Sequence, residues 1–286
     1  MVPWFWLLTR TADSRIFQKL TVPEIVERIF GDHGFTDYNL RLHGKYEQRE
    51  YIVQYRETDF NFVSRLLEEE GIYYFFEHEE KKHTLVLADL PVEHKVCPKQ
   101  EIVRYQVSAG GQLEEDVVSA LEMVKEIRPD KYSLNDYNYE TPKSNLKLSV
   151  SSKEPLWPEE LEIYDYPGEY GKYEDGARLV NIRMEEEEAR VTTIRGSSDC
   201  RSFVSGCRFK LQDYPRTDLN DKEYVLTSIS HNANQGGYRS DFFGGEGGDS
   251  SYSNQFTCIP YEIPFRPVRR ARKPVVEGVQ TAIVVG

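Results

Sequence analysis

The sequence predicts an α+β fold in which strands predominate. Residues 54–76 have the pattern of a strand end, a helix and a second strand, and from Ile102 onward short β-branched and aromatic runs are separated by turn residues. A regular series of short strands separated by turns is typical of a barrel or sandwich. The 286 residues are enough for two domains, each with its own core.

The first 34 residues predict one or two strands and then a helix. Val2 to Leu8 contains three aromatic residues and is expected to form a buried strand, with further strand up to Phe17. Thr21 and Glu24 have the spacing of a capping box, and Pro23 suits a first helical turn. Gly31 and Gly34 are expected to end this helix.

The best-defined helix follows Thr58 or Asp59, either of which can accept hydrogen bonds from the first free amides. One face is apolar, and Gly71 supplies the left-handed conformation that commonly closes a helix. A hairpin is then expected, with strands at 72–78 and 83–89. The apolar face comprises Phe60, Phe62, Val63, Leu66 and Leu67, and the opposite face comprises Asn61, Ser64, Arg65, Glu68 and Glu69.

The remaining predicted strands are interrupted by an insertion at about residues 129–190. The insertion contains a tyrosine-rich loop and a helix from about Glu174 to Ala189. The acidic block Glu185 to Glu188 on that helix is expected to be a solvated face. The predicted strands outside the insertion are Ile102–Val107, Val117–Ile127, Val191–Arg195, Cys207–Leu211, Tyr224–His231 and Asn254–Ile259.

Composition excludes several classes of partner. A net charge of −12 argues against nucleic acid, because a phosphate-binding face needs clustered Lys and Arg. The run from Val2 to Leu8 is far shorter than the roughly 20 residues that span a bilayer, and it lacks the features of a signal peptide.

Four scattered cysteines, Cys97, Cys200, Cys207 and Cys258, are expected to be buried free thiols rather than a disulfide scaffold.

No motif indicates catalysis, a cofactor or a metal. His78 and His83 are five apart rather than the four that a helical zinc motif needs, and turn residues between them favour a hairpin. Residues 244–249 match a single copy of a calcium-binding repeat, which needs stacked copies, so a hairpin loop is favoured. The basic and proline-rich stretch 266–274 predicts a semi-rigid linker, with binding of an anionic partner as the alternative.

Several stretches resemble a known family. QYRETDFNFVSRLLEEEGIYYFFEH, at residues 54–78, resembles the signature segment of the VgrG family, the spike proteins of bacterial type VI secretion, which are related to phage-tail baseplate hub proteins. YDYPGEY at 164–170, FTCIP at 256–260 and the final run 274–286 are similar to further family landmarks, in the same order. The residues that carry the resemblance are Tyr55, Arg56, Glu57, Asp59, Phe60, Asn61, Phe62, Gly71, Tyr166, Pro167, Gly168, Pro260 and Gln280.

The resemblance implies a hub-like antiparallel β-barrel with inserted α+β subdomains. It places the end of a first hub barrel and a small α+β unit at residues 1–95, and a second hub barrel at 96–262. A linker and the first strand of an oligonucleotide/oligosaccharide-binding-like barrel follow at 263–286. Because the family's opening strands, complete third barrel and β-needle have no counterpart here, we expect an internal fragment that is a monomer or weak oligomer.

The resemblance also implies a role. Family members form homotrimers that cap a hexameric tube protein of the Hcp type, contact baseplate components, and carry effector or adaptor proteins. They assemble in the cytoplasm and are then secreted without a signal peptide. The expected function is therefore structural and not enzymatic. The alternatives are the hub of a contractile phage tail or, less favoured, a hydrolase or toxin fused to a spike.

Overall fold

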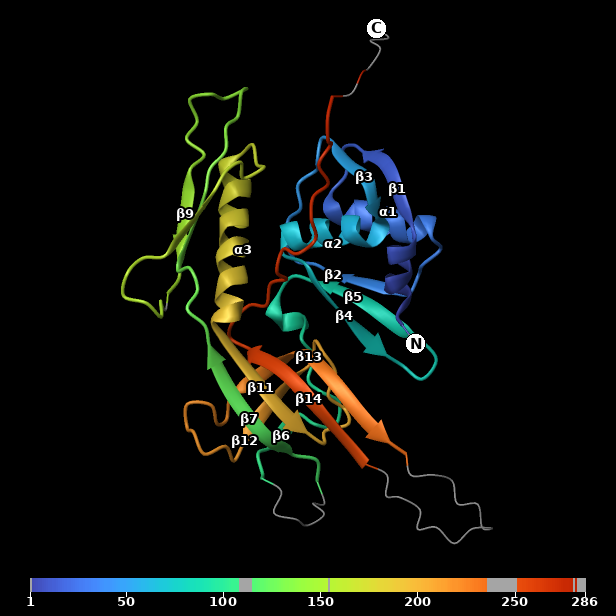
Figure 1. The fold of residues 1–286 in the computed structure, drawn as a ribbon, viewed down its shortest axis with the longest axis vertical. Coiled ribbons are helices and arrows are strands. Elements are labelled where there is room, and N and C mark those ends of the chain that lie inside the picture. The colour runs from blue at the N-terminus through green and yellow to red at the C-terminus, as the bar shows by residue number, and fades with distance from the viewer. Residues whose placement is uncertain (1, 108–114, 154, 236–250, 280, 282–286) are drawn as a thin grey trace.

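The computed structural model describes residues 2–107, 115–153, 155–235, 251–279 and 281. It has three parts, with a C-terminal segment (residues 261–279) that runs back between two of them (Figure 1). Strands outnumber helices, so the predicted class, α+β and mostly β, is confirmed. None of the described helices is long and apolar enough to cross a membrane.

The first part, here called the N-terminal unit, contains two small sheets and two helices around one apolar core. β1 pairs antiparallel with β3, and β5 lies between β2, its parallel neighbour, and β4. Phe5, Ile29, Phe62 and Leu87 are among its buried core residues. Its elements are η1 (Trp4–Arg10), β1 (Ala12–Phe17), α1 (Val22–Asp32), β2 (Tyr38–Arg41), β3 (Ile52–Thr58), α2 (Asp59–Glu70), β4 (Tyr73–His78), β5 (His83–Ala88) and η2 (Pro91–Glu93).

Most local signals in this unit are confirmed, although Gly31, which was expected to end α1, lies inside that helix. Thr21 and Glu24 form the predicted capping box of α1, and His78 faces His83 across the hairpin of β4 and β5. The strand expected at Val2 to Leu8 is wrong, because Trp4–Arg10 is a 3₁₀ helix. Phe5 and Leu8 are the two buried residues of that helix, and their spacing of three matches its period of three residues per turn.

The second part is a six-stranded sheet in the order β6-β12-β13-β14-β11-β7. All neighbours are antiparallel except β6 and β12. The sheet curls until its edges meet at an isolated bridge between Tyr105 and Val118, so that it forms a barrel-like wall around its own core. The strands are β6 (Ile102–Arg104), β7 (Val118–Lys125), β11 (Thr192–Ser198), β12 (Arg208–Gln212), β13 (Glu223–Asn234) and β14 (Ser251–Pro260).

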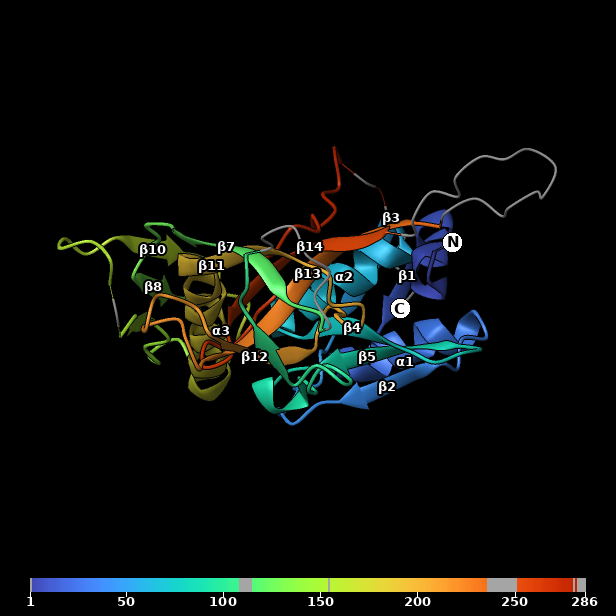
Figure 2. The same cartoon turned by 90° about the horizontal axis from the view of Figure 1, so that it is seen from below.

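The third part, here called the insert, lies in sequence between β7 and β11. Its strands β8 (Lys131–Leu134), β9 (Leu148–Ser151) and β10 (Glu162–Asp165) form a three-stranded sheet, and α3 (Tyr173–Val191) packs on it through a core that includes Leu134, Leu148 and Leu179. Seen from below, the curled sheet lies in the foreground, with the insert on one side and the N-terminal unit on the other (Figure 2).

All four cysteines are free thiols, as predicted, although they are not equally buried. Cys97, Cys200 and Cys258 are buried, whereas Cys207 is half-buried. The glycine-rich run at residues 244–249 lies outside the described residues.

Candidate functional site: the charged junction around α2

The helix α2 is buried on both its apolar and its polar faces. Thr58 is the N-cap, accepting a hydrogen bond from the Asn61 amide at 3.1 Å, and Gly71 ends the helix with φ of 72°. Phe62 and Leu66 are fully buried in the core of the N-terminal unit. On the opposite face Ser64 and Arg65 are buried, and Asn61, Glu68 and Glu69 are half-buried, so this polar face is largely covered by protein.

At the first turn of α2, Asp59 accepts hydrogen bonds from four side chains. Its Oδ2 atom lies 2.6 Å from Thr11 Oγ1 and 2.9 Å from His33 Nε2, and its Oδ1 atom lies 2.7 Å from Gln54 Nε2 and 3.0 Å from Arg15 Nη2. Burial alone would raise the pKa of this carboxyl, but the hydrogen bonds outweigh it and lower the pKa below its ordinary value. The carboxylate thus ties α2 to β1, to β3 and to the residues that directly follow η1 and α1.

Just before α2, at the end of β3, Glu57 binds two residues of the helix. Arg65 Nη2 lies 2.7 Å from Glu57 Oε1, and Asn61 Nδ2 lies 2.5 Å from Glu57 Oε2. The same amide nitrogen of Asn61 donates to the carbonyl oxygen of Arg272 at 3.0 Å. These bonds connect β3, α2 and the C-terminal segment.

At its C-terminal end, α2 meets α3 through arginines. Arg183 donates to the carbonyl oxygens of Glu68 and Glu69 and pairs with Glu186 at 3.0 Å. Glu70 is bound by Arg49 and by Arg178, the latter at 2.6 Å. Cationic side chains at the negative end of a helix dipole are favourable, and a buried carboxylate is tolerated when paired in this way.

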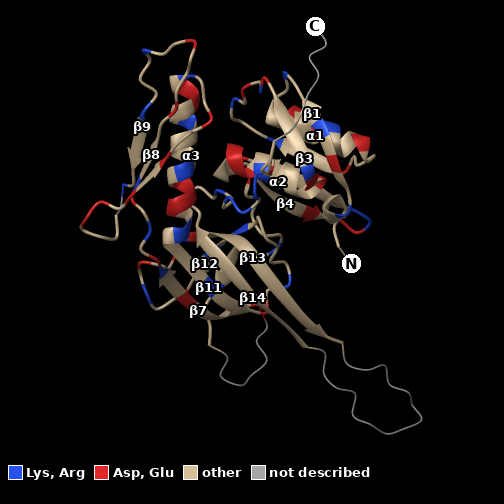
Figure 3. Ribbon diagram, turned by 45° about the horizontal axis from the view of Figure 1, so that its top comes forward, with Lys and Arg blue, Asp and Glu red and all other residues tan. Residues whose placement is uncertain are grey.

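The C-terminal segment occupies the space between α2 and α3. Arg266 donates to the carbonyl oxygens of Gly71 and Asp89, at 2.9 and 2.7 Å, and to Glu185 at 2.7 Å. Glu68 accepts the backbone amides of Arg270 and Ala271, each at 2.9 Å. We call this set of charged groups between α2, α3 and residues 266–273 the charged junction; the ribbon of the two helices and of the segment between them carries many blue and red positions in Figure 3.

Two sequence expectations are corrected here. The block Glu185 to Glu188 is not a solvated face, because Glu186 and Glu187 are 6 % and 7 % exposed and pair with arginines. Residues 266–273 are not a free linker, because Arg266 and Arg269 bind carboxylates of α3. The anionic partner of the basic stretch is thus the protein's own acidic block.

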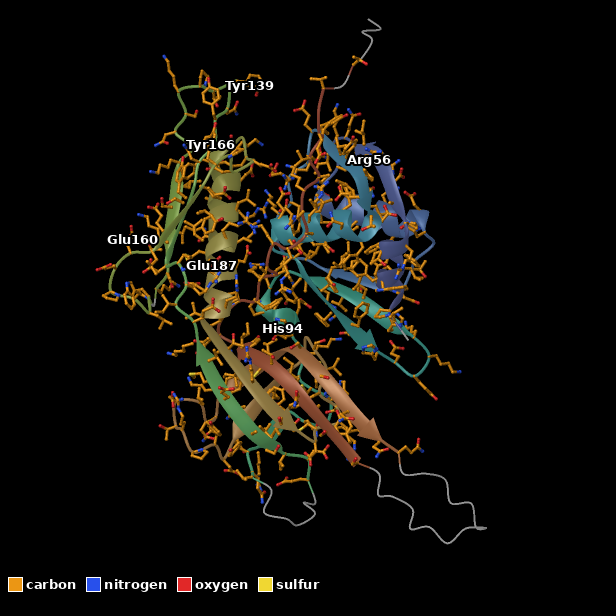
Figure 4. The ribbon with its side chains drawn as sticks, viewed as in Figure 1. Arg56, His94, Tyr139, Glu160, Tyr166 and Glu187 are labelled. Atoms are coloured by element: carbon orange, nitrogen blue, oxygen red, sulfur yellow. The ribbon has the colours of Figure 1, made fainter. Side chains whose placement is uncertain are left out.

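The other predicted residues lie apart from one another. Arg56 is exposed at positive φ of 50° on β3, far from Tyr166 (Figure 4). Tyr166 is 56 % exposed and precedes Pro167 through a cis peptide bond, and the amide of Gly168 donates to the carbonyl of Asn135 at 2.9 Å. Tyr55 and Phe60 are half-buried on β3 and α2, Pro260 pairs with Tyr224 at the end of β14, and Gln280 lies outside the described residues.

Sequence reasoning found one side of the charged junction and missed the other. Glu57, Asp59, Asn61 and Gly71 were singled out by the signature, and the structure brings them to one helix and its ends. Arg183 was missed, and Arg266 was noted only within a basic stretch whose anionic partner was left unnamed, because an arginine in a charged run carries no local signal of its partner. Within the described ranges, no group of three or more His, Cys, Asp or Glu side chains could hold a metal ion.

The family is shown by direct comparison. The family model of the phage tail baseplate hub (GPD) matches residues 1–237, and the chain belongs to this family. The curled sheet and the N-terminal unit therefore define a baseplate hub fold.

Within that class, the chain is similar to type VI secretion spikes, which confirms the resemblance to VgrG proteins. It is 39 % identical over 284 residues to the spike protein VgrG1b of Pseudomonas aeruginosa, a match that includes 99 % of this chain and 38 % of the relative. The chain thus spans about two fifths of the length of that curated relative.

Two solved structures share the fold. The c3393 protein of E. coli, described as a type VI secretion component with structural similarity to the T4 tail proteins gp27 and gp5, superposes with a TM-score of 0.66 at 22 % identity, covering 96 % of this chain and 58 % of that one. A 43 kDa tail protein of prophage MuSo2 from Shewanella oneidensis gives 0.60 at 12 % identity, covering 92 % and 74 %.

Proposed function

We propose that this chain is the hub portion of a type VI secretion spike. The observation that carries the proposal is its 39 % identity to a spike protein over 99 % of its residues, which extends well beyond the signature at 54–78. The work proposed is mechanical and not enzymatic: the hub caps the secretion tube and helps the spike to pierce a target envelope and deliver effectors.

The charged junction supports a mechanical role. It joins the N-terminal unit, α3 and the C-terminal segment through side chains that are paired and largely buried, such as Glu70 and Arg183. Buried ion pairs are costly to break one partner at a time, so the parts resist displacement relative to one another. The proposed division is a first hub region at 1–95, a second at 96–262 with its insertion at 129–190, and a connecting segment at 263–286.

The partners belong to the same proposal. We expect three copies in the assembled spike, a hexameric tube protein of the Hcp type beneath them, baseplate components around them, and effector or adaptor proteins as cargo. Assembly takes place in the cytoplasm, and export follows without a signal peptide.

The hub of a contractile phage tail is the second candidate. The similarity to a prophage tail protein at a TM-score of 0.60 favours it. We rank it lower because that likeness is at 12 % identity, whereas the spike relative is 39 % identical.

The test is a chimera. Residues 1–286 replace the matching region of VgrG1b in its own host, and the amount of tube protein released into the medium is measured. Release near the level of the unmodified spike is expected. A chimera that is stably produced but releases no more tube protein than a spike-deletion strain would overturn the proposal.

The oligomeric state of the isolated chain is a second property to measure. Light scattering over a concentration series separates a stable trimer, which would mean that hub surfaces are sufficient for assembly, from the monomer or weak oligomer that we expect.

A further inference from the structure

Two cysteines from distant parts of the chain meet where the N-terminal unit joins the curled sheet. Val96 forms an isolated parallel bridge with Arg208, the Cys97 amide donates to the Arg208 carbonyl at 2.8 Å, and the Arg208 amide donates to the Lys95 carbonyl at 2.8 Å. Residues 95–97 therefore run beside residues 207–208. The thiols of Cys97 and Cys207 are hydrogen-bonded to each other.

This contact lies at a closely packed seam. His94 Nδ1 is 2.9 Å from the carbonyl oxygen of Gly206, and Figure 4 shows His94 at the boundary between the two parts. Gly206 has φ of 88°, and a Cβ atom there would lie 2.5 Å from Phe75 Cγ of β4. The seam thus fixes the backbone on either side of the thiol pair.

We propose that Cys97 and Cys207 form a disulfide when the folded chain meets a low-molecular-weight disulfide such as oxidised glutathione. The Cys207 thiolate attacks one glutathione sulfur, forming a mixed disulfide and expelling one glutathione thiolate. Cys97 then loses its proton to solvent and attacks the Cys207 sulfur, expelling the second glutathione thiolate. The two protein thiols are oxidised, and one glutathione disulfide is reduced to two glutathione molecules.

The order of attack follows from burial and charge. Cys207 is half-buried, whereas Cys97 is 1 % exposed. The hydrogen bond from Cys97, helped by the nearby Lys95 cation, lowers the pKa of the Cys207 thiol. The hydrogen bond to Cys207, together with burial, raises the pKa of Cys97. An accessible thiol of low pKa beside a buried partner has the arrangement of an attacking and a resolving cysteine.

The bond would cross-link residues 97 and 207, enclosing the insert and three of the sheet's strands, β6, β7 and β11, in one covalent loop. Disulfides persist outside the cytoplasm and are reduced within it. The link would therefore form after export, a timing that rests on the proposed function, whereas the chemistry of the pair does not.

The experiment uses the full chain, purified reduced and equilibrated without oxygen over a series of ratios of oxidised to reduced glutathione. Samples are quenched with acid, alkylated with N-ethylmaleimide in denaturant, and analysed by intact mass and peptide mapping. We expect the loss of two alkylatable thiols, no retained glutathione, and linked peptides containing Cys97 and Cys207. The melting temperature should rise by about 5–10 °C in the oxidised sample.

Variants assign the roles. Cys97→Ser should stop with one glutathione on Cys207, and Cys207→Ser should retain all its thiols. Cys258→Ser, which removes a fully buried thiol of the same core, should still form the link. Wild-type protein that keeps four thiols, retains glutathione on Cys207, or links other cysteines would overturn the proposal. The mass and peptide map of the oxidised wild-type chain decide the proposal, so a variant that fails to fold does not affect the test. Failure of the spike chimera does not affect it either.

Discussion

The apolar core of the N-terminal unit and the charged junction share α2 but are stabilised in different ways. On one side Phe62, Val63 and Leu66 have no exposed surface and are surrounded by other apolar side chains. On the other side Glu70 and Arg183 are as deeply buried but are paired with opposite charges. Burial of apolar area is non-directional, whereas a buried ion pair is stable only with its partner in place. The core therefore makes the unit fold, and the charged junction selects one arrangement of α3 and the C-terminal segment.

The largest effect is expected in the core. Phe62→Ala removes a fully buried ring that stacks on Phe17 with centroids 5.4 Å apart. We expect the free energy of unfolding to fall by about 3–5 kcal/mol, measured by denaturant titration. Tyr139→Ala, at an 80 % exposed position, is the matched control and should leave the midpoint unchanged. Equal midpoints for the two variants would contradict the burial of Phe62.

The charged junction should be nearly as sensitive to the loss of one partner. Arg183→Met keeps the bulk of the side chain but leaves Glu186 with only Arg269 and leaves the carbonyls of Glu68 and Glu69 without this donor. We expect a loss of about 3 kcal/mol, because a buried carboxylate loses one of its two arginines and two backbone carbonyls lose a charged donor. Arg216→Ala, which breaks the exposed pair with Asp218, should not shift the midpoint. A neutral Arg183→Met variant would mean that the junction adds no stability.

A local effect is expected in the C-terminal segment. Arg266→Ala removes three hydrogen bonds to Gly71, Asp89 and Glu185. Losing charge-assisted bonds of this kind costs about 1.5–3 kcal/mol, so local opening should rise roughly 10- to 100-fold. Hydrogen exchange at the amides of Arg269, Arg270 and Ala271 measures this. Arg272→Ala, at an exposed position of the same segment, should leave these rates unchanged.

The smallest expected effect is on the pH dependence of stability, to which Asp59 and Glu68 should contribute with opposite signs. The pKa of Asp59 is below its ordinary value of 3.8, so its contribution to stability is present above that value and is lost as pH falls through the lowered pKa. Burial raises the pKa of Glu68 above 4.5, so the folded state holds the proton more tightly and stability declines as pH rises through the raised pKa.

Unfolding free energies of two variants between about pH 3 and 7 test this difference. Relative to wild type, Asp59→Asn should reduce the acid-induced loss of stability, and Glu68→Gln should reduce the decline that begins near pH 4.5. Profiles that change in the same direction for both variants would refute it.

The same comparison explains what could be predicted from sequence. The caps at Thr21 and Thr58, the end at Gly71 and the hairpin between His78 and His83 depend on neighbours within a few residues, and all were predicted. Glu68 and the amide of Arg270 are 202 residues apart, and Arg183 and the carbonyl of Glu68 are 115 apart. No local pattern encodes such pairs, so a charge run was assigned to solvent and a docked segment to a linker.

The path of the C-terminal segment has a consequence for how the chain acquires its structure. The contacts of the N-terminal unit lie within its first 90 or so residues, so its core can condense as soon as those residues have been synthesised. Arg266 and Arg269 are synthesised after the N-terminal unit, the insert and the curled sheet. Their contacts with α3 span about 80 residues, and contacts of high sequence separation form slowly. Until the C-terminal segment arrives, Glu185 lacks the Arg266 guanidinium and Glu68 lacks the amides of Arg270 and Ala271, whereas Glu186 already has Arg183. The bonds from Arg178 and Arg183 of α3 to the end of α2 need none of these late residues, so the C-terminal segment completes the docking of α3 on α2 and does not start it.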